Sequence, residues 1–400
     1  MSSQLKQTRV MTRANLASLP RRAWISLSMV LAVALVVSVL IGFLSMAKGF
    51  EKALAGAGSA SVAILLGGGT NQEIGSEVSP ETIRNLKADK GEIGIVRDVN
   101  GNLIASREIL VPVDARRISD GADQTLALRG MDSVGPSLRD GAMLSKGRLF
   151  APGSREIVVG ARIADGFSGF GIGDKVRLGA VDWTVVGHFS AEGSAFESEI
   201  WADIEAVQST FDRQGQVQTV RVRLDGPAGL PSLKAVLDAG ARTPIVAVAE
   251  IEFYASQSER TSSLIRLFGW PVALLMAIGA TAGALNTMMS SVSDRTVEIA
   301  TARTLGFSRF AVFVATWIEA VLLSAAGALA GMIGSSLVFN GWQASTLGAN
   351  NTQMAFQLSV TSDLMLQAGL LGLAIGIIGG ALPAFAATRL PLTSALRNKG

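Results

Sequence analysis

The chain has 400 residues, of which 49% are hydrophobic and 17% are charged, and its mean hydropathy is +0.40. Globular domains carry about 25% charged residues, so the composition excludes a wholly soluble enzyme, and the apolar content excludes a disordered chain. The sequence has no cysteine and one histidine, His188, which leaves no thiolate chemistry and little for metal binding. Its net charge of +3 is spread along the chain, so we expect no nucleic-acid partner.

Four apolar runs account for the low charge content: Trp24–Ala47, Leu264–Met289, Ala311–Phe339 and Leu364–Leu382. A helix needs roughly 20 apolar residues to cross a bilayer, so each run is long enough to span a membrane. The first run, with 24 residues, exceeds the apolar core of a signal peptide and is expected to be a retained anchor. We therefore predict an all-α transmembrane part of four helices, arranged one plus three, with an inserted extracytoplasmic α+β domain.

Basic residues flank the outermost runs: Lys6, Arg9, Arg13, Arg21 and Arg22 come before the first, and Arg389, Arg397 and Lys399 come after the last. Such flanks stay in the cytoplasm, so we expect both termini inside a bacterial inner membrane and the segment 49–262 outside. That segment holds 22 basic and 28 acidic residues.

The predicted order of segments is a cytoplasmic amphipathic lead-in 1–23, transmembrane helix 24–48, extracytoplasmic domain 49–262, transmembrane helix 263–290, cytoplasmic loop 291–309, transmembrane helix 310–339, short external loop 340–363, transmembrane helix 364–382 and cytoplasmic tail 383–400.

The external domain mixes strand and helix patterns, which indicates an α+β fold of undetermined strand order. The predicted strands are Ser61–Leu66, Ile109–Val113, Thr125–Leu128, Glu156–Val159, Lys175–Leu178, Trp183–Val186 and Thr219–Leu224. The predicted helices are Pro80–Lys87, Ile204–Phe211 and Pro231–Leu237, with Ser79 as the N-cap of the first. Trp183 and Trp201 are expected in the core of this domain.

Patterns for catalysis and cofactor binding are weak. The sequence contains no Gly-Lys dipeptide, so the phosphate-binding Walker loop is absent and no enzyme activity is expected. We interpret the run 169–173, with glycines at alternate positions, as a turn, and His188 as a partly buried structural residue rather than a catalytic one. For Glu192, Glu197 and Glu199 a solvated acidic loop is favoured over a calcium site. No catalytic, cofactor or metal residue is predicted.

Within the apolar runs the sequence shows one acidic residue, Glu319, which is expected to form an interhelical hydrogen bond or to snorkel, with a proton relay as the less favoured alternative. Glycines four residues apart let helix backbones approach closely. The predicted packing pairs are Gly279 with Gly283, Gly327 with Gly331, Gly372 with Gly376, and Gly376 with Gly380.

The loop 291–309 reads SVSDRTVEIATARTLGFSR. The charge spacing of Asp294, Arg295 and Glu298 supports a short helix with those charges exposed. We expect an apolar side formed by Val297, Ala300 and Leu305, a helix end at Gly306 and a cap on the next helix at Ser308. A charged amphipathic helix of this kind is typical of a partner-docking element; an ordinary solvated loop is the alternative.

The segment DRTVEIATARTLGFSRFAVFVATWIEAVLLSAAGALAG resembles FtsX-like, MacB-type ABC transporter permeases, a family that includes lipoprotein-releasing and DevC-like permeases. Its family pattern reads ERxxEIGxxRALGAS, followed by a span. The matching residues are Arg295, Glu298, Ile299, Arg303, Leu305, Gly306, Ser308, Glu319, Ala320 and Gly327. Asp294, Ala300 and Thr304 depart mildly from the family residues. The resemblance continues in 14–38, 147–186 and the closing PAFAATRLPLTSALR at 383–397, and it is least in the residues between Leu86 and Asp140.

The resemblance implies an export or extraction permease that transmits ATP-driven motion to its external domain. The implied partners are a separate cytoplasmic ATPase, a second permease copy or homologue, a periplasmic adaptor and membrane lipid, with ATP held only by the ATPase. The residues implied to couple to the ATPase are Asp294, Arg295, Glu298, Ile299, Arg303, Leu305 and Gly306. Two alternatives stay open: a non-transporting subunit that regulates a cell-wall hydrolase, and a membrane-anchored enzyme built on 50–262.

Overall fold

The computed structural model describes residues 2–89, 91–240, 244–348 and 350–389. The chain forms two compact units. The helix unit contains the chain up to Lys48, Ser263–Trp342 and the chain from Leu358 onward, and the sheet unit contains Gly49–Ser262 and Gln343–Gln357. The predicted tail continues past residue 389, so Arg397 and Lys399 lie outside the described residues.

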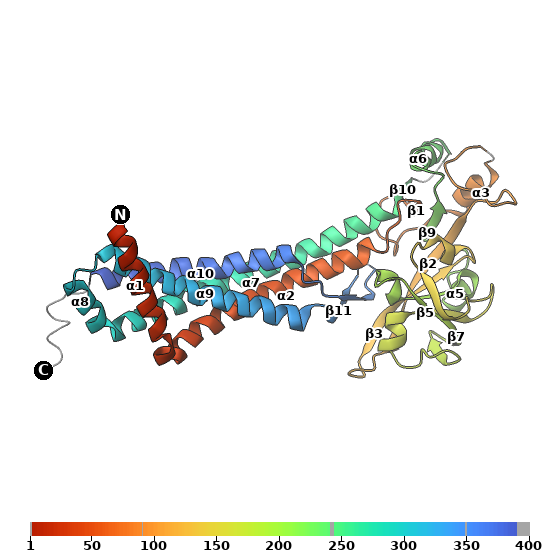
Figure 1. Ribbon diagram of the computed structural model, residues 1–400. Helices are drawn as coiled ribbons and strands as arrows, with labels where there is room; N and C mark the ends of the chain where they lie inside the picture. Colours follow the sequence, from red (N-terminus) through yellow and green to blue (C-terminus); the bar gives the residue numbers. More distant parts are fainter. Residues whose placement is uncertain (1, 90, 241–243, 349, 390–400) are drawn as a thin grey trace. The chain divides into compact units, whose positions relative to one another are not determined.

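The helix unit is built from long helices that run side by side in Figure 1. Its elements are α1 (Ser2–Ser18), η1 (Leu19–Arg22), α2 (Ala23–Ala55), α7 (Glu250–Asp294), α8 (Thr296–Thr304), α9 (Arg309–Phe339) and α10 (Ser362–Thr388), and α2 and α7 extend into the sheet unit. Within the described ranges, four helices are long and apolar enough to cross a membrane: α2, α7, α9 and α10. Each contains one of the predicted apolar runs.

Close packing between α2, α9 and α10 depends on small residues. A Cβ added at Gly327 or Gly331 would lie 2.6 or 2.7 Å from a backbone oxygen of α2, and one at Gly376 would lie 2.4 Å from the Ser324 Oγ of α9. Gly372 and Gly380 approach α9 in the same way. These distances leave no room for a side chain, so the spacing on α9 and α10 allows the helices their close contact.

The other predicted glycine pair behaves differently. Gly279 and Gly283 on α7 are exposed, and a Cβ at either position would meet no atom within 4 Å among the residues that the structure describes. Neither glycine therefore brings two described helices of this chain together.

The sheet unit combines a large mixed sheet with short helices. Its strands are β1 (Val62–Gly67), β2 (Ala105–Arg116), β3 (Asp123–Met131), β4 (Met143–Gly147), β5 (Glu156–Gly160), β6 (Lys175–Leu178), β7 (Val181–Ser190), β8 (Glu199–Asp203), β9 (Thr219–Arg223), β10 (Ile245–Ala249), β11 (Gln343–Leu347) and β12 (Gln353–Gln357). Its helices are α3 (Pro80–Ala88), η2 (Gly135–Leu138), α4 (Ala161–Gly166), η3 (Ala195–Ser198), α5 (Ile204–Thr210) and α6 (Gly229–Gly240). All the strands and helices predicted in 49–262 are confirmed, whereas β4, β8, β10 and α4 were not predicted.

Strand order explains how distant segments meet. The large sheet runs β10-β1-β9-β2-β3-β8-β5-β7-β4, with β6 paired to β7. The pairs β3–β8 and β5–β7 are parallel and the others are antiparallel. Two apolar clusters fill this unit, one including Trp183 and the other including Leu233, and Trp201 is also buried. The predicted core positions of both tryptophans are confirmed.

The predicted short external loop 340–363 contains a second, two-stranded sheet. Strands β11 and β12 pair antiparallel and belong to the sheet unit. In β12, Met354 and Phe356 are buried and alternate with less buried residues, which is the period of a strand that covers a core with one face.

Candidate functional site

Helix α8 has nine residues and lies between α7 and α9 in the chain. The backbone conformations before and after it determine where it begins and ends. Arg295 stands between the last residue of α7 and the first of α8, with ψ near 13°. After α8 the backbone enters the left-handed region at Gly306, with φ +98°, where a residue with a Cβ would be strained. The Ser308 Oγ then accepts a hydrogen bond from the Ala311 backbone N–H, which confirms the predicted cap of α9.

The inner face of α8 is anchored by Ile299 and Ala300, which are both buried. Around Ile299 lies an apolar cluster formed by Met11, Val292, Val312, Ala315 and Ala387. The outer face carries the exposed residues Val297, Glu298, Thr301, Thr304 and Leu305. The predicted common side of Val297, Ala300 and Leu305 is therefore wrong: positions four apart point outward together, while Ala300 points into the helix unit.

Arg295 is only 9% exposed, so the expectation that its charge faces solvent is wrong. Its Nη1 donates to Glu319 Oε2 at 3.1 Å, its Nη2 donates to Asn15 Oδ1, and its Nε donates to Glu298 Oε2 at 3.3 Å. The loop sequence could not show this, because Asn15 and Glu319 lie on other helices. Glu298 itself stays exposed, as predicted.

Glu319 is held by two arginines. Besides Arg295, the Arg22 Nη2 lies 3.4 Å from Glu319 Oε1, and the Glu319 side chain is 2% exposed. Arg22 also donates to the hydroxyl groups of Ser18 and Ser291. The predicted interhelical hydrogen bond of Glu319 is confirmed. We call Asn15, Arg22, Ser291, Arg295 and Glu319 the helix-end cluster.

Two further side chains fix α8 to its neighbours. The Gln7 side chain of α1 donates to the Gly306 carbonyl at 3.4 Å and accepts from the Ser308 backbone N–H at 3.1 Å. The Arg303 Nη1 donates to the Thr388 carbonyl oxygen at the end of α10, at 2.9 Å. Both ends of α8 are therefore held by side-chain hydrogen bonds.

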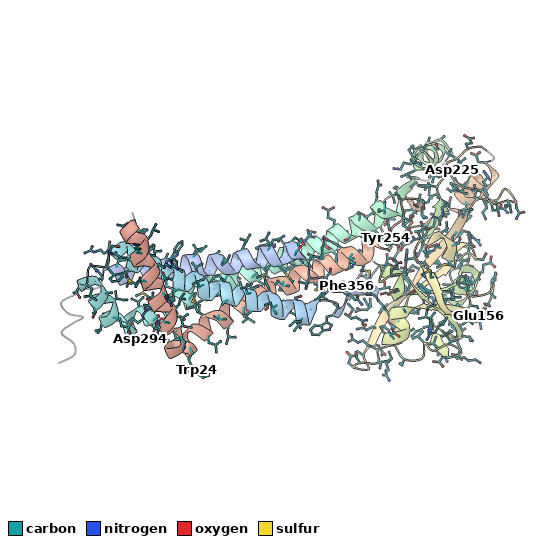
Figure 2. All side chains as sticks on the ribbon, viewed as in Figure 1. Trp24, Glu156, Asp225, Tyr254, Asp294 and Phe356 are labelled. Carbon is teal, nitrogen blue, oxygen red and sulfur yellow. The ribbon has the colours of Figure 1, made fainter. Side chains whose placement is uncertain are left out.

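The predicted coupling residues divide into two groups. Asp294, Glu298 and Leu305 are exposed, and Leu305 is 76% exposed. Arg295 and Ile299 are buried, Arg303 is half-buried, and Gly306 forms the turn. Figure 2 shows Asp294 at the same end of the helix unit as Trp24. The accessible residues thus surround the outer face of α8, and the buried ones hold the helix in place.

A second charged cluster lies inside the sheet unit and was not predicted. Arg221, Glu108, Arg129 and Glu199 stand on the neighbouring strands β9, β2, β3 and β8, in that order. The residue directly opposite each one on the next strand is Ser106, Met131 or Trp201, and the next charged residue stands two positions from it. Because side chains two positions apart point to the same face of a strand, all four charges share one face of the sheet. Successive pairs meet at 3.0, 3.1 and 2.7 Å. The result is a row of alternating charges across the sheet.

Residues from other segments of the sheet unit also bind this row of charges. Glu73 binds Arg129 at 2.8 Å and Arg221 at 3.0 Å. Arg221 also donates to Glu250, the first residue of α7, and to the Tyr254 hydroxyl one turn later. Arg139 binds Glu108 at 2.7 Å. We call the residues Glu73, Glu108, Arg129, Arg139, Glu199, Arg221, Glu250 and Tyr254 the sheet cluster.

The neighbouring arginines keep the buried carboxylates of Glu73 and Glu108 ionised. Burial alone would raise the pKa of Glu73, but the charges of Arg129 and Arg221 outweigh it and hold that pKa far below the ordinary range. Burial opposes the same effect at Glu108, where Arg139, Arg221 and Arg129 lower the pKa to about 2. The pKa values of Glu73 and Glu108 therefore lie well below the near-neutral range that suits an acid–base catalyst.

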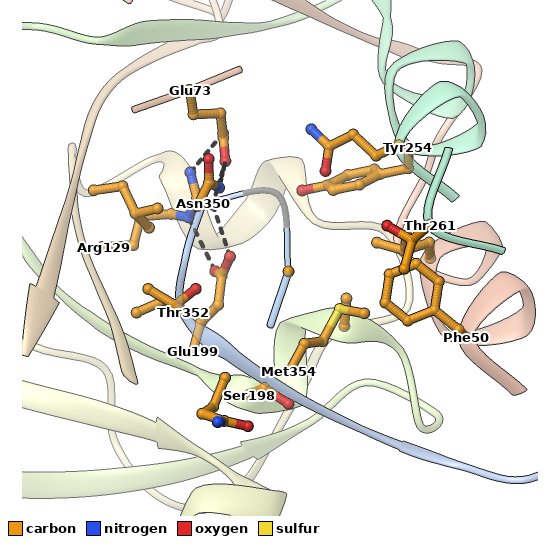
Figure 3. A pocket seen from close by; sticks show the side chains of 17 residues that line it. Phe50, Glu73, Arg129, Ser198, Glu199, Tyr254, Thr261, Asn350, Thr352 and Met354 are labelled. Carbon is orange, nitrogen blue, oxygen red and sulfur yellow. Dashed lines mark hydrogen bonds and ion pairs between the residues drawn. The ribbon is translucent and has the colours of Figure 1, made fainter. Parts of the chain in front are cut away.

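A small cavity adjoins the sheet cluster (Figure 3). Figure 3 shows Arg129 joined by dashed lines to Glu73 and Glu199, with Asn350 beside them. Asn350, in the β11–β12 turn, donates to Glu73 at 3.2 Å. The cavity volume is about 50 Å³, which suits a few water molecules and excludes a drug-sized ligand, since such ligands occupy pockets of about 300 Å³ or more.

The acidic residues that follow β7 are not a solvated loop, so that prediction is wrong for Glu197 and Glu199. Glu197 accepts from the backbone N–H groups of Ala191 and Gly193 and from Arg162, and Glu199 pairs with Arg129. Glu192 alone is exposed. Within the described residues, no group of three His, Cys, Asp or Glu side chains could hold a metal ion.

The predicted partial burial of His188 and the predicted turn at 169–173 are confirmed. His188 is half-buried, and its Nε2 lies 2.7 Å from the Phe170 carbonyl oxygen, which is a structural contact. The glycine run that begins at Gly169 forms turns before β6, with positive φ at Gly169 and Gly173.

A signal for the missed hairpin was present in the sequence. Two short segments, 343–347 and 353–357, flank the turn-forming run GANN, which is the spacing of two strands joined by a hairpin loop. The sheet cluster had a weaker signal: Glu108 and Arg129 each interrupt an apolar strand, and a charged residue on a buried face requires a partner. The sequence alone could not say which partner.

Comparison with known families bears on both units. A model described as MacB-like periplasmic core domain matches residues 26–239, and a model described as FtsX-like permease C-terminal matches residues 270–392. The chain belongs to the FtsX-like, MacB-type family of ABC transporter permeases. The match places both the external domain and the region around α8 within one family, as the resemblance in the loop 291–309 predicted.

Individual relatives are distant. The macrolide export ATP-binding/permease protein MacB of Bordetella avium is 26% identical over 235 residues, covering 56% of this chain and 35% of the relative. The protein of the same name from Photorhabdus laumondii is 24% identical over 336 residues, covering 80% of this chain and 46% of the relative. The chain thus spans less than half the length of these relatives.

One solved structure is similar to part of this chain. The periplasmic region of MacB from Actinobacillus actinomycetemcomitans is 11% identical and covers 53% of this chain and 94% of that chain, with a TM-score of 0.36. At this score the superposition adds nothing to the family assignment.

Proposed function

We propose that this chain is the permease subunit of an export or extraction system in a bacterial inner membrane, with four spans, both termini in the cytoplasm and a second permease chain beside it. Its outer α8 face binds an ABC ATPase carried on a partner subunit, and the external domain performs the work. The observation that carries the proposal is a short helix with a buried inner face and an outer face of Val297, Glu298 and Leu305, in a chain of this family.

The outer face has the chemistry of a docking element. Leu305 is 76% exposed and Val297 is 38% exposed, with the carboxylate of Glu298 beside them. An amphipathic helix that inserts apolar side chains into a groove gains affinity by burying them, and a charged neighbour adds specificity. The sequence itself contains no Walker pattern, so the proposal assigns ATP hydrolysis to the partner.

A periplasmic adaptor and an outer duct would complete the export system. The match of the MacB-like core domain to 26–239 supports export over the alternative, a subunit that regulates a cell-wall hydrolase. Co-purification from intact membranes distinguishes the two: an adaptor supports export, and a bound hydrolase whose activity follows ATP supports regulation.

The test of ATPase binding uses the full chain in lipid nanodiscs and a candidate partner ABC ATPase from the same organism. Leu305→Asp should weaken binding by roughly 10- to 100-fold, because it removes buried apolar area and adds a charge at the contact. Val99→Asp is the matched control, since Val99 is a fully exposed apolar residue of the sheet unit. Equal ATPase affinity in wild type and Leu305→Asp would contradict the proposal.

A further inference from the structure

The helix-end cluster contains a guanidinium that bonds in three directions. Arg295 stands at the corner between α7 and α8, and its Nη1, Nη2 and Nε reach Glu319 of α9, Asn15 of α1 and Glu298 of α8 respectively. A lysine has a single nitrogen and could not reproduce this fork. The corner of the chain is therefore tied to two other helices by one buried side chain.

The Glu319 carboxylate also binds in two directions, because each of its oxygens accepts a hydrogen bond from a different arginine. Oε2 accepts from Arg295 and Oε1 accepts from Arg22, which belongs to η1, directly before α2. One carboxylate thus links the α7–α8 corner to the start of α2. Arg22 also donates a hydrogen bond to Ser291 in the last turn of α7, so the end of α7 and the start of α2 are joined directly as well.

Physical chemistry makes such a link stiff. Glu319 lies in an otherwise apolar helix with 2% of its side chain exposed, and a buried carboxylate is stable only while its partners stay close. If α8 moved without α9 and α2, the carboxylate would lose one arginine while still buried. Movements that keep both pairs intact are favoured, and these carry the three segments together.

We infer that Arg295 and Glu319 are positioning residues of a junction that passes movement of α8 to α9 and α2, and that they do not contact the ATPase. The inference rests on the proposed function, because it assumes that an ATPase moves α8. It separates the coupling residues into two sets: an outer set that determines affinity for the ATPase, and this inner pair, which determines how far ATPase movement is transmitted.

The experiment uses the same candidate ABC ATPase with the permease in nanodiscs. It measures the Kd of the ATPase for the permease and the change in ATP hydrolysis rate caused by saturating permease. Glu319→Gln keeps the size and removes the charge. We expect a Kd within about threefold of wild type and a rate change reduced by roughly tenfold, a typical magnitude for coupling between sites. Leu305→Asp is the matched control on the outer face, where Leu305 is 76% exposed, and it should raise the Kd and leave the rate change at saturation intact.

Two further variants keep the test decisive. Arg295→Gln combined with Glu319→Gln should be no worse than either single variant, because residues that act as one unit give non-additive effects. Arg295→Lys retains the charge, so its rate change should be larger than that of Arg295→Gln. A partly restored rate change also shows that the variant protein has folded. Full additivity, or an unchanged rate effect in Glu319→Gln, would overturn the inference.

The failure of the inference is distinguishable from failure of the proposed function. If wild-type permease neither binds the ATPase nor changes its rate, the proposed function fails and the inference falls with it. If wild type binds and Glu319→Gln weakens binding as much as Leu305→Asp, the proposed function stands, and the pair belongs to the docking surface instead.

Discussion

The sheet cluster and the helix-end cluster are both built from buried glutamate and arginine side chains, but they stabilise different kinds of structure. In the sheet cluster, four carboxylates and three guanidinium groups alternate within one folded unit, mostly on neighbouring strands. In the helix-end cluster, one carboxylate lies between two guanidinium groups that come from separate helix ends. The first arrangement fixes the pairing of strands, and the second ties together segments that could otherwise move apart.

Exposure strengthens the contrast. In the sheet cluster Arg221 and Glu108 are completely buried, whereas Arg22 and Arg295 retain 12% and 11% of their side-chain exposure. A long arginine side chain near a surface can turn its head toward water when its partner is lost, and a fully buried one cannot. Loss of one partner should therefore destabilise the sheet unit more than the helix unit.

The largest effect is expected for Arg221→Met. It leaves Glu108, Glu73 and Glu250 each without one partner inside the sheet unit, and breaking a buried ion pair from one side costs about 3–5 kcal/mol. Hydrogen exchange of β9 and β2 amides in the full chain measures this loss. Arg148→Met is the control, because Arg148 pairs with Glu156 near the surface, where such pairs contribute about 0–1 kcal/mol. Equal protection in the two variants would refute the distinction.

A second prediction concerns acid. Arg139, Arg221 and Arg129 overcome burial and lower the pKa of Glu108 to about 2, whereas its ordinary value is 4.5. The folded state thus favours the ionised carboxylate, and its stabilisation is complete above about pH 4.5 and is lost as the pH falls toward 2. Exchange protection of β2 should decline in that window and stay constant from pH 5 to 7.

The control for the acid prediction is Glu108→Gln. This variant should start with lower protection at pH 7 and show a flatter dependence below pH 4.5, since the titrating group is gone. An unchanged slope in the variant would assign the acid sensitivity to other carboxylates.

The smallest effect is expected in the helix unit. Glu319→Gln should reduce the exchange protection of α8 by about 1–2 kcal/mol, because interhelical polar contacts in membranes contribute modestly and both arginines can turn outward. Ser324→Ala on the same helix is a comparison variant that removes no ion pair. A loss in Glu319→Gln as large as that in Arg221→Met would contradict the comparison of the two clusters.

Local patterns predicted a large part of the fold. The apolar runs located the long helices, alternation and turn residues located strands such as β6 and β7, and Ser79 and Ser308 were identified as caps from their neighbours in sequence. Each of these features depends on residues a few positions away. The spacing rules for helices and strands are sufficient to find them.

Features that depend on distant residues were missed. Arg295 was expected at the surface because its neighbours are charged, but its burial depends on Asn15, 280 positions away, and on Glu319 of another helix. Glu199 was assigned to a solvated loop because no partner for it stands nearby in the sequence. Its partner, Arg129, lies 70 positions earlier, on a strand that pairs with β8 in the folded chain. Sequence spacing carries no record of such partners.

The most direct test of the proposed ATPase contact compares the outer and inner faces of α8. A photo-crosslinking amino acid is placed at Leu305 on the outer face, or at Ile299 on the inner face, in the full chain reconstituted with a candidate partner ABC ATPase from the same organism. We expect a crosslink to the ATPase from position 305 and none from position 299. A crosslink from position 299, or none from position 305 while the two proteins remain bound, would contradict it.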